Sequence, residues 1–162
     1  MNFLKRLFSK PAREPADVPP EFLQETPPDW LLDLKGKESP EGSNFSIRVQ
    51  LFTAQRTGTA EILILPRDES EQPKTATTEL ARPELDKLFV ILGFSFPDEM
   101  ESVPVDDSEG PSVTLSVHRR EPLQMRSADC NLAGWLDSKK TGAPVIEISR
   151  ILIAARNRAL PK

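Results

Sequence analysis

Proline placement restricts the fold of this chain more than any other feature of its sequence. The chain has 16 prolines among its 162 residues, about twice the usual share, and many of them lie in residues 11–28. Proline fixes φ and removes a backbone donor, so this stretch should run extended, as a semi-rigid spacer. Regular hydrophobic patterning begins only at Phe45. We therefore predict a flexible N-terminal segment over residues 1–43 that folding does not require, followed by a single α+β domain over residues 44–162.

Alternation of apolar and polar residues predicts the strands. Residues 45–51 and 60–65 form the first such pair, separated by a turn at Thr57-Gly58. Residues 113–117 and 123–128 form the second pair. A period of two is typical of a strand with one buried face, and each pair should form a hairpin. The polar stretch 67–78 is predicted to be a loop.

Two stretches show the helical period instead. Each begins at a proline and places apolar residues at intervals of three and four, as expected of a helix with one buried stripe. The stripes are Leu85, Leu88, Phe89 and Leu92 after Pro83, and Val145, Ile148, Leu152 and Ala155 after Pro144. The predicted fold is two β-hairpins in one antiparallel sheet with two amphipathic helices on one face, in the order ββαββα.

Cysteine content and hydropathy bear on the location of the protein. Cys130 is the only cysteine, so no disulfide can form within the chain, and a reducing compartment is expected. No apolar run is long enough to span a membrane, and the N-terminus lacks the apolar core of a secretory signal. We expect a soluble, cytoplasmic protein, with possible peripheral contact at a membrane surface.

The sequence contains no known catalytic or cofactor-binding motif. Cys130 and His118 are single members of their kinds, and a nucleophilic pair between them has no support from spacing. The acidic run 106–110 lacks the ligand spacing of a calcium loop. We expect no enzyme activity, no cofactor, no metal and no small-molecule ligand, and keep a small enzyme with an unrecognised site as a third choice.

Charge is divided unevenly along the chain. Residues 61–110 hold 13 acidic and 4 basic side chains, whereas residues 111–162 hold 9 basic and 4 acidic ones. The two regions either neutralise each other within the fold or form opposed surfaces. An acidic surface would suit a small inhibitor or immunity-type protein that blocks a basic site on an enzyme. Nucleic-acid binding is not expected, because no aromatic residues lie among the arginines of the C-terminal region.

Two apolar groups near the N-terminus are candidates for docking. The first forms a helical stripe with a basic rim and would fold only on contact with a partner or an anionic membrane; it consists of Phe3, Leu4, Leu7 and Phe8. The second follows Pro28 in a predicted short helix and consists of Trp30, Leu31 and Leu34. A plain tail is the alternative for the first group, and packing on the core is the alternative for the second. Our first hypothesis is that the chain is a non-enzymatic binding or adaptor protein that docks a protein partner through this segment.

Overall fold

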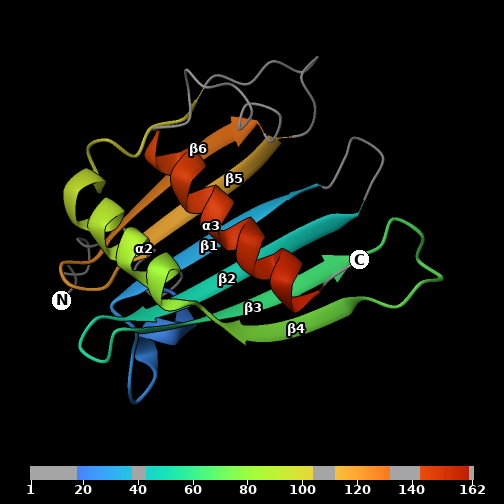
Figure 1. The fold of residues 1–162 in the computed structure, drawn as a ribbon, viewed down its shortest axis with the longest axis horizontal. Helices are drawn as coiled ribbons and strands as arrows, with labels where there is room; N and C mark the ends of the chain where they lie inside the picture. The colour runs from blue at the N-terminus through green and yellow to red at the C-terminus, as the bar shows by residue number, and fades with distance from the viewer. Residues whose placement is uncertain (1–17, 38–42, 104–111, 132–142, 161–162) are drawn as a thin grey trace, which may run out of the picture.

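The computed structural model describes residues 18–37, 43–103, 112–131 and 143–160, which form a single antiparallel sheet with two helices over one of its faces (Figure 1). The strands lie side by side in the order β4-β3-β2-β1-β5-β6. Along the chain the elements are η1 (Pro20–Leu23), β1 (Trp30–Lys37), β2 (Asn44–Phe52), β3 (Thr57–Leu65), β4 (Lys74–Glu79), α2 (Arg82–Ser95), β5 (Ser112–Arg119), β6 (Gln124–Asn131) and α3 (Pro144–Ala159).

The predicted fold class is wrong in two elements, which make the order ββββαββα instead of ββαββα. The first is β1, which lies in the middle of the sheet where a short helix was expected. Leu32 and Leu34 of this strand face the helices and Leu31 faces the other way, yet all three are fully buried. Burial on both faces hides the alternation that identifies a strand. The predicted boundary at residue 43 therefore falls after a strand that belongs to the sheet.

The second missed element is β4, which occupies part of the predicted loop 67–78 and pairs with β3. This edge strand is polar, and its exposed and half-buried residues alternate without a fully buried one. Its three threonines suit a strand because β-branched side chains pack well on a pleated surface. Ala76 is the only apolar residue of this strand, so no apolar alternation marks it in the sequence.

The other strands and both helices are where the sequence predicted them. The strands β2 and β3 pair as one hairpin, and β5 and β6 pair as another. The helix α2 buries Leu85, Leu88 and Leu92 of its predicted stripe and ends at Ser95. The helix α3 buries Val145, Ile148 and Leu152 along its predicted stripe. The hydrophobic core lies between these helices and one face of the sheet, so α2 and α3 cover that face alone.

One glycine shows how closely α2 approaches the sheet. A Cβ atom placed on Gly58 of β3 would lie 2.8 Å from side-chain carbons of both Leu51 and Leu85. Gly58 therefore allows Leu85 of α2 to pack against the β2–β3 hairpin.

None of the helices in the described ranges is long and apolar enough to cross a membrane.

Candidate functional site

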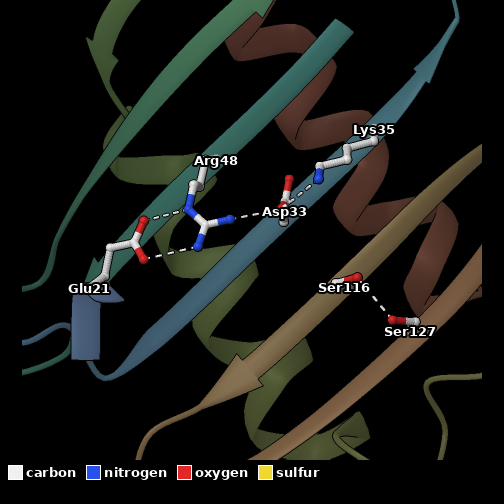
Figure 2. A network of polar contacts seen from close by, with 6 residues as sticks. All are labelled: Glu21, Asp33, Lys35, Arg48, Ser116 and Ser127. Carbon is white, nitrogen blue, oxygen red and sulfur yellow. Dashed lines mark hydrogen bonds and ion pairs between the residues drawn. The ribbon is translucent and has the colours of Figure 1, made fainter. Parts of the chain in front are cut away.

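The face of the sheet that the helices leave uncovered is polar, and we call it the open face. Because side chains alternate along a strand and residues paired across strands point the same way, the register assigns its members. They include Asp33 and Lys35 of β1, Ser46 and Arg48 of β2, Glu61 of β3, Ser116 and His118 of β5, and Ser127 of β6. Figure 2 looks onto this face, with the helices behind the sheet.

One end of the open face is covered by residues 18–25, which we call the strap and which contain η1. Phe22 of the strap is buried, and so is Leu31 of β1, although neither belongs to the core under the helices. Leu31 points to the open face because it pairs with Gln50 and His118. The strap therefore forms a small second apolar cluster on this face.

An arginine joins the strap to the middle of the sheet (Figure 2). Arg48 donates two hydrogen bonds to the carboxylate of Glu21, one of them at 2.9 Å, and a third to Oδ2 of Asp33 at 2.8 Å. The hydrogen bonds from Arg48 lower the pKa of Glu21, and those to Glu21 raise the pKa of Arg48. Both groups are thus held in their charged forms. A carboxylate held in this way suits an ion pair, whereas a general acid needs a raised pKa.

Asp33 lies between the strap and the rest of the open face. Its Oδ2 atom also approaches Nζ of Lys35 at 3.8 Å, while its buried Oδ1 atom has no hydrogen-bond partner among the described residues. The opposite residue on β5, Ser116, shares a hydrogen bond with Ser127 at 2.9 Å instead. Asp33 therefore remains able to accept one more hydrogen bond.

The far end of the open face is hollowed. A cavity of about 570 Å³ lies where β1 ends and β2 begins. Its polar lining comes from Lys35, Lys37, Asn44, Ser46 and Thr114, and its apolar lining comes mainly from Leu63 and Leu65. By register, all of these side chains belong to the open face. We call this cavity the hollow.

Cys130 and His118, whose spacing in the sequence does not support a nucleophilic pair, lie apart in the structure. His118 lies on the open face, opposite Leu31, whereas Cys130 pairs with Val113 and is buried on the helix-covered face. The sheet separates the two side chains. Burial lowers the pKa of His118, and the positive charge of Arg48 acts in the same direction. In the described ranges, no three His, Cys, Asp or Glu side chains gather closely enough to hold a metal ion.

The structure places the second predicted docking group inside the sheet. Leu34 and Leu31 are fully buried on opposite faces. Trp30 is half-buried and packs edge-to-face against Phe96, with ring centroids 5.3 Å apart. These residues pack within the molecule. The first group, Phe3, Leu4, Leu7 and Phe8, lies outside the described residues.

Several basic residues of the C-terminal region are paired within the fold. Arg158 donates hydrogen bonds to Glu84 at 2.8 and 3.0 Å, which joins this region to the acidic one. Arg120 donates to Asp29, and Arg126 donates to the carbonyl oxygen of Met100. In the Arg158–Glu84 and Arg120–Asp29 pairs, charges from different parts of the chain neutralise each other.

The comparisons with known proteins give this site no parallel. No protein-family model matches the chain, and no curated protein matches it either. The role of the open face therefore has to be argued from its own residues.

Proposed function

We propose that this chain is a non-enzymatic binding or adaptor protein, and that the open face of its sheet receives a protein partner. The observation that carries the proposal is the contrast between the two faces. Helices cover one face completely enough to bury its strand residues, while the other bears charged and polar side chains and a hollow. Arg48 pairs with carboxylates there, which supports a role in holding segments of chain in place.

The N-terminal segment fits this proposal as a second docking element. The strap lies on the open face, and residues 1–17 directly precede it in the chain. The apolar stripe of Phe3, Leu4, Leu7 and Phe8 would then contact the partner, or a membrane next to it. Both elements could contact one partner without a change in the fold.

The inhibitor hypothesis has less support. It needs an accessible acidic surface in residues 61–110, but two carboxylates of that region are engaged by arginines. Glu84 pairs with Arg158, and Asp86 pairs with Arg56. At these two positions a basic target would have to displace an arginine.

Site-specific photo-crosslinking in cells that make the protein naturally tests the proposal. A photoreactive residue replaces Thr77 of β4 or Ser127 of β6 on the open face, and Ala154 on the outer side of α3 is the matched control. We expect a discrete protein adduct from both open-face positions and none from Ala154. Adducts from Ala154 alone, or the absence of adducts from both open-face positions, would contradict the proposal. Deleting residues 1–17 should weaken the adduct if the N-terminal segment contributes.

A further inference from the structure

The hollow carries a repeated side-chain pattern that points to a particular ligand. Register places Lys35 opposite Ser46 and Ser46 opposite Leu63. The next row of the same parity places Lys37 opposite Asn44 and Asn44 opposite Leu65. Each row therefore has a cation on β1, a small polar residue on β2 and a leucine on β3. The hollow therefore has Lys35 and Lys37 along one side, which we call the basic wall. Leu63 and Leu65 form the other side, the apolar wall, and small polar residues lie between the two.

Within the described part of the chain, both walls have exposed side chains. The side chain of Lys35 is 68% exposed, and Lys37 has no ion-pair partner among the described residues. Leu65 is 43% exposed and lies beside Leu63 of the same strand face. Positive charge on one side and apolar surface on the other require a ligand with the opposite charge on one edge and apolar groups on the other.

The strap shows that the same face already holds such a segment. Its adjacent residues Glu21 and Phe22 divide the two roles. The Glu21 carboxylate binds the Arg48 guanidinium, and the Phe22 side chain is buried on the face that Leu31 occupies. An acidic residue bound to a cation therefore lies next to a buried apolar residue in the strap. The hollow offers cations and apolar side chains at the other end of the same strands.

The spacing within the hollow matches an extended peptide. Lys35 and Lys37 are two residues apart on one strand, as are Leu63 and Leu65 on another. Such pairs repeat about every 6.8 Å, which is also the repeat of same-side residues in an extended chain. A segment lying along β2 would direct alternate side chains toward β1 and toward β3.

We propose that the hollow binds an extended segment of a partner protein in which acidic and apolar residues alternate. The acidic side chains lie against Lys35 and Lys37, and the apolar ones lie against Leu63 and Leu65. This inference rests on the proposed function and names the partner chemistry of one part of the open face.

The test measures binding of fluorescent hexapeptides to the full chain by anisotropy. The probe is Glu-Leu-Glu-Leu-Glu-Leu, and the controls are Lys-Leu-Lys-Leu-Lys-Leu and Glu-Ser-Glu-Ser-Glu-Ser. We expect the probe to bind more tightly than either control and to weaken as salt is raised, because exposed charges are screened. Equal binding of the basic peptide would overturn the inference.

Variants locate the binding. The double substitution Lys35→Gln with Lys37→Gln should weaken the probe about fivefold, the scale of two exposed ion pairs. Leu65→Ser should weaken it about tenfold, the scale of one partly buried leucine, while Phe94→Ser removes a side chain that is 84% exposed on α2 and should change nothing. Thermal melts confirm that each variant folds. Unchanged binding in the lysine variant, or an effect of Phe94→Ser as large as that of Leu65→Ser, would contradict the proposal.

Competition with decanoate, which has one carboxylate and an apolar chain, distinguishes a small-molecule site from a peptide-binding site. We expect decanoate to displace the probe only weakly, and displacement at a lower concentration than the peptide would overturn the proposal in favour of a small ligand. Photo-adducts at Thr77 and Ser127 without probe binding would contradict this inference and leave the proposed function standing. If the open-face positions give no adducts but the probe binds at the hollow, the proposed function is contradicted and the peptide-binding property of the hollow stands.

Discussion

The two faces of the sheet are made by the same strands and yet differ in almost every property. On β1, Leu32 and Leu34 point toward the helices and are fully buried, whereas Asp33 and Lys35 point to the open face. On β2, Ile47 and Val49 are buried under the helices, and Arg48 between them bonds to the strap. Neighbouring residues thus serve a core on one side and a charged surface on the other.

This difference indicates which residues determine folding and which remain available for binding. Apolar burial is the main favourable term in folding, and nearly all of it lies on the helix-covered face. The open face contributes a local cluster under the strap and a few ion pairs. Changes on the two faces should therefore have different consequences.

Truncation is expected to produce the largest effect. A chain that begins at Asn44 loses β1, which pairs with both β2 and β5 in the middle of the sheet. We expect this chain to lose its cooperative thermal melt, contrary to the expectation that residues 1–43 are dispensable. A chain that begins at Val18 keeps the strap and β1 and should melt cooperatively. A cooperative melt of the shorter chain, followed by circular dichroism, would show that β1 is not essential.

A core truncation on α2 should have the next largest effect. Leu88 is fully buried, and Leu88→Ala should lower the free energy of unfolding by about 2–5 kcal/mol through lost contacts and a cavity. Val90 lies on the same helix but is 57% exposed, so Val90→Ala is the matched control and should cost less than about 0.5 kcal/mol. Urea denaturation measures both. Similar costs for the two variants would mean that α2 does not pack as described.

Loss of the arginine on the open face should have an intermediate effect. Arg48→Met keeps much of the side-chain volume but leaves the carboxylates of Glu21 and Asp33 without their donor. We expect a loss of about 1–3 kcal/mol, the cost of leaving partly buried polar groups unpaired. Adding Glu21→Gln should recover part of it, as a double-mutant cycle by urea denaturation would show. If the two substitutions are strictly additive, the strap is not held by this contact.

The pH dependence of stability should be smaller and should fall in two windows. The pKa of His118 is lowered in the fold from its ordinary value of 6.5, so the unfolded chain binds a proton first and stability falls as the pH drops below that value. The pKa of Glu21 is lowered from 4.5, so its contribution is present above that pH and is lost as the pH falls through the folded pKa. Urea midpoints between pH 8 and pH 3 measure both windows. His118→Asn should remove only the upper one, and a variant with an unchanged profile would contradict the assignment.

The strands that the sequence reveals are those with a single buried face. On β2, Phe45, Ile47 and Val49 are buried and alternate with polar residues, so the pattern is readable. The strand β1 is buried on both faces at Leu31 and Leu32, and the edge strand β4 is exposed along much of its length. Neither strand shows apolar and polar residues alternating along its whole length, for opposite reasons. Burial on two sides depends on the strap and on distant strands, which a local pattern does not reveal.

The candidate site could be predicted only in part. The position of Arg48 on the polar side of its strand followed from alternation, but its partner Glu21 is 27 residues away and was assigned to a spacer. The apolar run at residues 62–65 is a further signal in the sequence. Four consecutive apolar residues at a strand end imply apolar side chains on both faces, and two of them, Leu63 and Leu65, line the hollow.

The most direct test of the division between the faces compares adjacent residues of β1. Leu34→Ala and Lys35→Gln are each examined by urea denaturation and by anisotropy with the Glu-Leu-Glu-Leu-Glu-Leu probe. We predict that Leu34→Ala lowers the free energy of unfolding by about 2–5 kcal/mol and leaves the affinity of the folded protein unchanged. Lys35→Gln should leave stability within about 0.5 kcal/mol of the parent and weaken the probe about twofold. A loss of stability in Lys35→Gln, or a loss of affinity in folded Leu34→Ala, would contradict the account.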